Sequence, residues 1–324
     1  MKIGIFTATF LDRPLDDVVK MAAEYGYEAI ELPAFLDNPH LDIEDIVKGN
    51  NAKEFKKRIG DLGISTISAL SNHMEGWLVL GPYDSDSDLT FKGTKEEKIK
   101  FGTDRMIKTA QAASALEVPV VVGFIGCENF NRFFPSPIMK HWNKMEEEFV
   151  DRWGKILDKF EEYGVRFAHE PHPNQLVYDI HTAVRSVELM EGRKEWGFNF
   201  DPANLLYLGI DVENFIDKLK DRIYYVHAKD CEIVSHNFGK SGAMARGPWG
   251  RLDRGYRLRI PGWGDINWKS ILTELSLIGY DYVVSYEHED ATMSRMDGLK
   301  KTIAHLKPLV ISAPYEGRND ILFQ

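Results

Sequence analysis

The sequence predicts a single-domain α/β protein that folds as a closed (β/α)₈ barrel. Short runs of β-branched and aromatic residues alternate eight times with segments whose apolar residues recur at helical spacing. No low-complexity stretch, linker or change in composition interrupts this alternation. The length of 324 residues also suits one barrel, since such domains run to ~250 residues and beyond. We therefore expect the barrel over residues 1–310 and a C-terminal tail over residues 311–324.

Each repeat of the alternation gives one strand and then one helix along the chain. Gly26 and Gly63 directly follow the first two helical segments, and glycine at this position commonly ends a helix. The run 119–124 is apolar throughout, which favours a parallel strand buried on both faces. The expected strands are 2–10, 27–33, 64–70, 119–124, 165–171, 197–202, 223–228 and 282–286. The expected helices are 15–25, 52–62, 95–116, 145–163, 180–190, 212–220, 268–278 and 293–309.

Two long loops and one insertion interrupt the regular spacing. A polar loop that contains Trp77 follows the third strand, and an aromatic loop follows the fourth. An insertion over about residues 232–266 follows the seventh strand and holds few residues of core type. The aromatic loop carries Phe130, Phe133, Phe134, His141 and Trp142, and the insertion carries Arg246, Arg251, Arg254, Arg257 and Arg259.

Composition excludes several classes of protein. The net charge of -10 argues against nucleic acid as a partner, because phosphate binding needs a basic face. No apolar run approaches the ~20 residues of a membrane span, and Thr7 and Thr9 interrupt any signal-peptide core. Cys127 and Cys231 form no disulfide framework and no zinc-binding spacing. We therefore expect a cytoplasmic protein that acts on a small molecule.

Four consecutive predicted strands, the fifth to the eighth, each end on a residue that can bind a metal. The C-terminal ends of barrel strands line the mouth where active sites lie. Three carboxylates and one imidazole suit a divalent cation such as Mn²⁺, Mg²⁺ or Co²⁺, and Zn²⁺ stays open. A single carboxylate after a strand is as often a helix N-cap, so the repetition on four strands carries the prediction. The four residues are Glu170, Asp201, His227 and Glu287.

A metal held in this way leaves positions for two adjacent oxygens of a substrate. There it can polarise a carbonyl group and stabilise an enediolate while a carbon-bound proton is removed. Glu170 or Glu287 could act as the base, since each would face the substrate. The sequence therefore favours an enzyme that removes a proton next to a carbonyl.

The motifs around these residues resemble the xylose isomerase-like barrel family, the sugar isomerases and epimerases related to endonuclease IV. The resemblance covers nearly the whole barrel and implies that the four residues bind one divalent metal, often manganese, with Glu170 and Glu287 beside the substrate carbons. The nuclease branch would need a histidine-rich zinc cluster and a basic face, which this chain lacks. The matching motifs are His169-Glu170-Pro171, Asn199-Phe200-Asp201-Pro202, Val226-His227-Ala228-Lys229-Asp230, Pro261-Gly262-Trp263-Gly264 with Trp268, and Tyr286-Glu287.

Two positions depart from the ketose 3-epimerases of this family. Asn204 stands where those enzymes tend to have histidine, and Lys229 follows His227 where they have arginine. The chain is also similar to the large subunit of C-glycoside deglycosidases, which pairs with a small partner subunit. That resemblance implies removal of the proton next to the keto group of a 3-keto-glycoside and expulsion of the aglycone. His141 or a ligand glutamate would be the base.

The other candidate residues have a substrate-binding interpretation and a structural one. Trp77, Phe134 and Trp142 would stack on an aglycone or pack on the barrel rim. His172 would touch substrate or lie in the rim, and Lys229 would touch substrate or pair with Asp230 or Glu232. Arg257 would bind an anionic group or contact another subunit.

Elimination from a 3-keto-glycoside is the leading prediction of function. Isomerisation or epimerisation of a sugar or sugar phosphate is the alternative, and a non-catalytic sugar-binding subunit is the third. An oligomer is expected, because the insertion and the tail after Ile311 offer surfaces for contacts.

Overall fold

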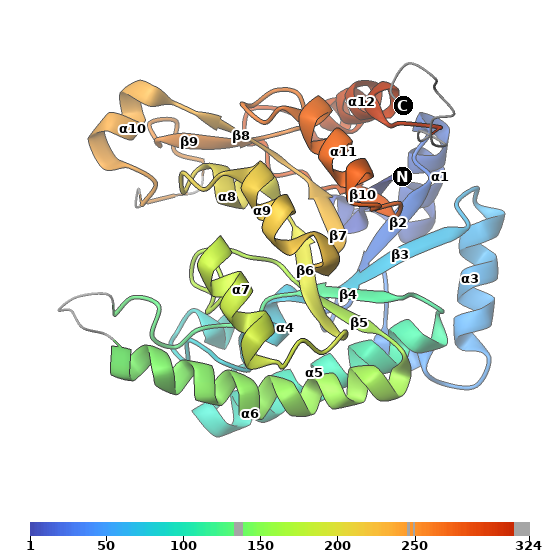
Figure 1. The fold of residues 1–324 in the computed structure, drawn as a ribbon. Coiled ribbons are helices and arrows are strands. Elements are labelled where there is room, and N and C mark those ends of the chain that lie inside the picture. Colours follow the sequence, from blue (N-terminus) through green and yellow to red (C-terminus); the bar gives the residue numbers. More distant parts are fainter. Residues whose placement is uncertain (133–138, 245–246, 249, 314–324) are drawn as a thin grey trace, which may run out of the picture.

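The computed structural model describes residues 1–132, 139–244, 247–248 and 250–313. Among them, eight parallel strands close into one barrel, and neighbouring strands follow the order of the chain (Figure 1). The first strand closes the ring by pairing with the last, so that Lys2 lies opposite Val283. This architecture confirms the predicted fold class. The barrel strands are β1 (Lys2–Phe6), β2 (Ala29–Pro33), β3 (Thr66–Ser71), β4 (Val120–Gly123), β5 (Arg166–His169), β6 (Trp196–Phe200), β7 (Ile223–Ala228) and β10 (Val283–Tyr286).

Helices surround the barrel and connect its strands (Figure 1). The long helices α5 and α6 lie against each other along one flank. Among the described residues, no helix combines the length and the apolar character needed to cross a lipid bilayer. The longer helices are α1 (Leu15–Tyr25), α3 (Asn51–Asp61), α5 (Lys95–Ala115), α6 (Met139–Tyr163), α7 (Ile180–Leu189), α9 (Val212–Leu219), α11 (Trp268–Leu277) and α12 (Arg295–Leu306). The short ones are α2 (Ile43–Ile46), α4 (His73–Trp77), α8 (Pro202–Leu206) and the 3₁₀ turns Thr7–Phe10, Ser87–Leu89, Lys220–Arg222 and Lys307–Leu309.

Two predicted boundaries differ clearly from the structure. The first strand ends at Phe6 because the next four residues form a 3₁₀ turn, which buries Phe10 without continuing the strand. Helix α6 begins at Met139, six residues earlier than expected. Residues 140–144 of this helix are mostly exposed, so apolar spacing marks only the turns from Met145 onward.

The loop after β3 is not simply polar, contrary to the sequence prediction. It opens with α4, which places Glu75 in a fully buried position. The Glu75 carboxylate accepts hydrogen bonds from the Arg105 Nε at 2.8 Å, the Asn72 side chain at 2.6 Å and the Leu36 backbone at 2.7 Å. This network joins α4 to α5 and to the loop after β2. The segment also buries Leu78, Val79 and Leu80.

Side chains fill the barrel interior in two layers. Because side chains alternate along a strand, residues two positions apart point to the same side. One buried cluster is mostly small and apolar, and its largest member is Tyr225. Two positions further along five of these strands the residue is polar, so a polar layer lies directly above the apolar one. The apolar layer is Ala29, Ala69, Val120, Ala168, Tyr225 and Val283, and the residues that follow are the polar Glu31, Ser71, Glu170, His227 and Ser285, with Val122 after Val120.

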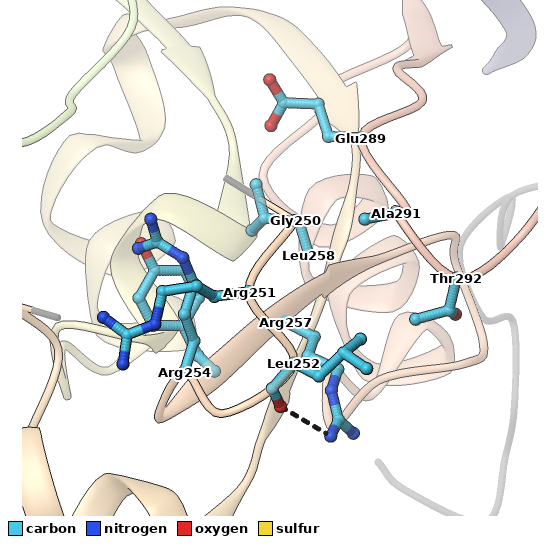
Figure 2. A pocket seen from close by; sticks show the side chains of 10 residues that line it. Gly250, Arg251, Leu252, Arg254, Arg257, Leu258, Glu289, Ala291 and Thr292 are labelled. Atoms are coloured by element: carbon cyan, nitrogen blue, oxygen red, sulfur yellow. Dashed lines mark hydrogen bonds between the residues drawn. The ribbon is translucent and has the colours of Figure 1, made fainter. Parts of the chain in front are cut away.

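The insertion after β7 forms a small substructure beside the mouth (Figure 1). Its strands β8 (Asp230–Ile233) and β9 (Tyr256–Arg259) pair antiparallel, with α10 (Ser235–Ser241) between them. A small pocket lies where this substructure meets the loop after β10, and Arg257 and Glu289 belong to its lining (Figure 2). The insertion therefore reaches the strand end that carries Glu287.

Asp230 closes the end of the insertion. Its carboxylate accepts hydrogen bonds from the backbone of Gly262 at 2.9 Å and of Ile266 at 3.1 Å, and from the Trp268 indole at 3.0 Å. A Cβ atom at Gly264 would lie 2.3 Å from an oxygen of Asp230, so a larger residue does not fit there. The Pro-Gly-Trp-Gly motif thus serves to return the chain to the barrel.

Candidate metal centre

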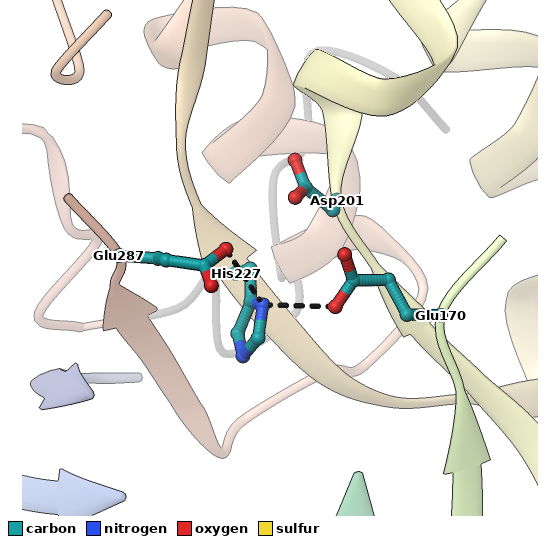
Figure 3. A group of neighbouring side chains, drawn as sticks. All are labelled: Glu170, Asp201, His227 and Glu287. Carbon is teal, nitrogen blue, oxygen red and sulfur yellow. Dashed lines mark ion pairs between the residues drawn. The ribbon is translucent and has the colours of Figure 1, made fainter. Parts of the chain in front are cut away.

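Four side chains at the mouth of the barrel lie close enough to share one metal ion (Figure 3). One potential ligand atom from each lies within 4.8 Å of the others. They come from the C-terminal ends of β5, β6, β7 and β10. Pro171 and Pro202 directly follow two of them and end the strand pairing there. The structure thus brings together the four residues that the sequence singled out, Glu170, Asp201, His227 and Glu287.

Asp201 combines the two roles that the sequence left open. Its Oδ1 accepts the backbone N–H of Ala203 at 3.0 Å and caps α8. Its Oδ2 accepts a hydrogen bond from Asn204 at 3.1 Å and lies 2.8 Å from the Lys229 ammonium. The helix cap therefore uses one oxygen and leaves the other on the side of the cluster.

His227 contacts a carboxylate that reaches it across the barrel interior from β2, three strands away. Its Nε2 lies 3.0 and 3.1 Å from the two oxygens of Glu31, so the Nε2–H group donates a hydrogen bond to that carboxylate. Its Nδ1 lies 3.1 Å from Glu170 and 3.4 Å from Glu287 (Figure 3). Nδ1 is buried and has no hydrogen-bond partner within the described residues. A buried lone pair that faces two carboxylates fits a bound cation.

Glu170 and Glu287 have different surroundings. Asn204 donates to one oxygen of Glu170 at 2.7 Å, and Asn199 donates to the other at 2.8 Å. The His73 ring nitrogen lies 3.1 Å from that second oxygen. The Glu287 carboxylate contacts Lys229 at 2.9 Å, and its side chain keeps 16% of its surface exposed, against 4% for Glu170. Glu170 is held in place, whereas Glu287 faces the open side.

Lys229 brings a positive charge to the same cluster. Its Nζ lies 2.8 Å from Asp201, 2.9 Å from Glu287 and 3.1 Å from Glu289. Burial alone would lower its pKa, but these carboxylates raise the pKa well above the ordinary value. Lys229 is therefore an ammonium ion that donates hydrogen bonds at the mouth.

The carboxylates affect one another strongly. Burial raises the pKa of Asp201 to about 7, although Lys229 opposes this shift. Burial alone would also raise the pKa of Glu287, but Lys229 and His227 lower it to about 2. Like charges this close cannot all be ionised without added positive charge. A divalent cation supplies that charge, so the donor set fits the predicted metal.

The remaining predicted residues fall into two groups. Asn204 and Lys229 contact the cluster directly, as described above. The other group lies further out. The ring of His172 lies beside Phe124, and its Nδ1 is 2.7 Å from the Pro173 carbonyl. Arg257 lies 3.4 Å from Glu232 and lines the small pocket of the insertion (Figure 2).

The aromatic candidates are dispersed over the rim. Trp142 lines a cleft of about 700 Å³ with Phe130 and Tyr178. Trp77 is partly buried at the end of α4, and His141 lies exposed in the first turn of α6 with no contact to the four residues within the described chain. Phe134 lies outside the described residues. The base role of His141 stays a prediction.

Sequence reasoning assigned no role to three residues that contact the cluster. Glu31, His73 and Asn199 touch His227 or Glu170. The same rule of strand ends would have found one of them, since His73 lies just after the third strand. Glu31 is the middle residue of β2, so that rule does not reach it. Asn199 would have been found by alternation, since it lies two residues before Asp201.

Comparison with known proteins supports the architecture. A family model described as xylose isomerase-like TIM barrel matches residues 19–309. The chain is 25% identical over 320 residues to the uncharacterized protein YfiH of Bacillus subtilis (strain 168), which covers 96% of this chain and 99% of that protein. Two solved structures each cover 95% of this chain and 99% of the other. They are the probable 3-DHS dehydratase AsbF from Bacillus anthracis, with a TM-score of 0.66 and 18% identity, and the 3-keto-D-glucoside 4-epimerase YcjR from E. coli, with a TM-score of 0.67 and 16% identity.

Proposed function

The chain belongs to the xylose isomerase-like TIM barrel family, and we propose that it is a metal-dependent sugar enzyme that removes a proton next to a carbonyl group. Glu170, Asp201, His227 and Glu287 would hold one divalent cation. Mn²⁺ is the proposed ion, and the oxygen-rich donor set also suits Mg²⁺, Co²⁺ or Zn²⁺. When bound, the cation supplies positive charge beside the carbonyl oxygen of the substrate.

The contrast between the two glutamates supports elimination as the outcome. Both oxygens of Glu170 accept hydrogen bonds from asparagine side chains, and these bonds favour its ionised form and hold it in one orientation. Glu287 is more open and lies beside an ammonium group. One free base and one acid suit elimination, whereas epimerisation at one carbon needs proton transfer on both of its faces. We therefore assign Glu287 as the base and Lys229 as the acid.

The proposed step conserves atoms and charge. Glu287 takes the proton from the carbon next to the keto group, and the electron pair of that C–H bond forms a C=C bond. The bond from the neighbouring carbon to the leaving group breaks, and the leaving group keeps its electron pair. Lys229 donates the proton that the leaving group needs. The products are an unsaturated keto sugar and the free aglycone.

The cleft beside the mouth supports an aromatic leaving group. Phe130 and Tyr178 meet edge to face at 5.2 Å, and Trp142 meets Tyr178 at 6.3 Å in the same manner. Pro173, three residues after Glu170, and Leu208, in the loop after α8, also line this cleft. Aromatic walls of this kind can stack on an aglycone. A 3-keto-glycoside with an aromatic aglycone, O-linked or C-linked, is the proposed substrate.

Isomerisation or epimerisation of a sugar or sugar phosphate is the second candidate. His73 favours it, because its ring nitrogen lies 3.1 Å from Glu170 and could carry a proton on the side opposite Glu287. The choice between the two outcomes depends on whether the carbon that loses its proton is reprotonated or loses a neighbouring group.

The test is turnover with the metal as the controlled variable. The full chain is stripped with EDTA, reloaded with Mn²⁺ and assayed on 3-keto-glucosides of a flavonoid and on free ketoses and aldoses, with and without phosphate. Aglycone release that needs the metal supports the proposal, and release by the chain alone would remove the need for a small partner subunit. Interconversion of free sugars only would favour the second candidate. Sugar binding without any turnover would make the chain a binding subunit, and a chain that binds no metal would overturn the proposal.

Glutamine variants separate the two glutamates. Glu287→Gln should lower turnover by about 10²–10⁴-fold at saturating metal, because it removes the base. Glu170→Gln should chiefly weaken metal binding and regain much of the activity when the metal concentration is raised. Equal losses at saturating metal would contradict the assignment of a single base.

A further inference from the structure

Glu31 is a buried carboxylate on β2, a strand that carries none of the four candidate ligands. Besides His227 it accepts a hydrogen bond from Ser285 at 2.6 Å and another from Ser71. These partners come from β7, β10 and β3. Glu31 therefore lies at the centre of a polar layer that spans the barrel interior.

A purely structural role explains this carboxylate poorly. Burying an ionised group costs several kcal/mol, and well-packed apolar residues often do as well or better in its place. The layer below is apolar, so the fold fills the barrel interior without charge on these strands. Glu31 is distinguished by its contact with Nε2 of His227, because the other ring nitrogen, Nδ1, faces Glu170 and Glu287.

We propose that Glu31 is a positioning residue for the metal centre, an inference that rests on the proposed function. By accepting the Nε2 proton, it fixes the His227 tautomer in which Nδ1 offers its lone pair to the cation. Its negative charge makes that nitrogen a stronger donor. Phe6 stacks at 6.0 Å on the imidazole, and Tyr225 meets it edge-on at 5.8 Å, so the plane of the ring is fixed as well.

Ser71 and Ser285 complete this arrangement. Each serine donates to a different oxygen of Glu31, so the carboxylate cannot rotate without losing one of them. The two oxygens then remain together at Nε2 of His227. Glu31 on β2 thus orients His227, the candidate ligand on β7.

The experiment measures metal affinity rather than turnover. Stripped full-length protein is titrated with Mn²⁺ and with Co²⁺ by calorimetry, and the visible spectrum of the cobalt form reports the geometry around the ion. Glu31→Gln keeps the shape but removes the charge, and it should weaken binding by about 10–100-fold. Glu195→Gln is the matched control, since Glu195 is also buried but pairs with Arg193 before β6, at the opposite end of the barrel. It should leave both metal affinities unchanged.

Each outcome decides one question. If wild type binds no divalent ion, the proposed function and this inference fail together. If wild type binds and Glu31→Gln binds equally well with an unchanged cobalt spectrum, the inference fails and the proposed function stands. Should Glu31→Gln not fold, Ser285→Ala replaces it, and a severalfold weaker affinity with an altered spectrum is then expected. An unchanged affinity in Ser285→Ala would overturn the inference.

Discussion

The earlier half of the barrel, from β1 to α5, and the later half, from β5 to β10, use charged residues at strand ends in opposite ways. After β3, Glu75 accepts three hydrogen bonds from protein donors, and one donor is the guanidinium of Arg105. After β5, β6 and β10, the carboxylates face one another and His227. A carboxylate surrounded by its own donors is satisfied within the fold. Carboxylates that face each other need positive charge, which Lys229 supplies in part. The later half therefore holds the candidate metal centre, and the proposed cation would supply the rest of that charge.

Removing the imidazole from the later half should have the largest effect. His227→Ala takes away the nitrogen donor and leaves three carboxylates that repel one another. We expect bound metal to fall to background and turnover to fall by ~10³-fold or more, which corresponds to about 4 kcal/mol of lost transition-state stabilisation. Metal analysis and the aglycone assay measure the two effects. His305→Ala, an exposed histidine on α12, is the control and should behave as wild type.

The later half was also the part that the sequence predicted best. Its four strand ends repeat one pattern, and each ligand candidate adjoins a strand whose apolar run is easily recognised. Glu31 escaped prediction because the second strand is buried on both faces, so its pattern does not show which side chains point into the barrel. A glutamate inside such a run was the available signal.

Other features depend on contacts between distant segments. The sheet of the insertion pairs Asp230 with Arg259, and its end is fixed by hydrogen bonds from Gly262, Ile266 and Trp268 to the Asp230 carboxylate. Nothing local in the insertion predicts that pairing. The aromatic cleft likewise forms from segments that lie far apart in the chain, with Trp142 on α6 and Tyr178 in the loop after β5, so the sequence indicated Trp142 but not its neighbour Tyr178.

Breaking the network of the earlier half should cost stability and spare the metal. Glu75→Gln removes a buried charge from Arg105, and the free energy of unfolding should fall by about 2–3 kcal/mol. Glu44→Gln alters a half-exposed partner of the same arginine and should cost less than about 0.5 kcal/mol. Urea denaturation measures both variants. A large loss of Mn²⁺ affinity in Glu75→Gln would show that the two halves are not separate in function.

The smallest expected effect concerns the junction between the insertion and the later half. Asp290, after β10, accepts a hydrogen bond from Arg259 at 2.9 Å and two from Thr292 at 2.7 and 2.8 Å. Although burial alone would raise the pKa of Asp290, these hydrogen bonds lower it. A carboxyl group with a lowered folded-state pKa stabilises the fold above its unfolded pKa of ~3.9 and loses this contribution as the pH falls further.

Asp290→Asn should therefore lower the free energy of unfolding by about 1–2 kcal/mol at pH 7. The gap to wild type should stay constant from pH 7 down to about pH 5 and narrow only as the pH approaches ~4, where the unfolded aspartate begins to bind protons. Asp253→Asn, which alters an exposed pair with Arg251 in the same insertion, should cause no measurable change. Denaturation at several pH values tests the sign. If the difference in the free energy of unfolding between wild type and Asp290→Asn widens as the pH falls, the pKa of Asp290 is raised in the folded protein. The ion pair with Arg259 would then not be what joins the insertion to the barrel.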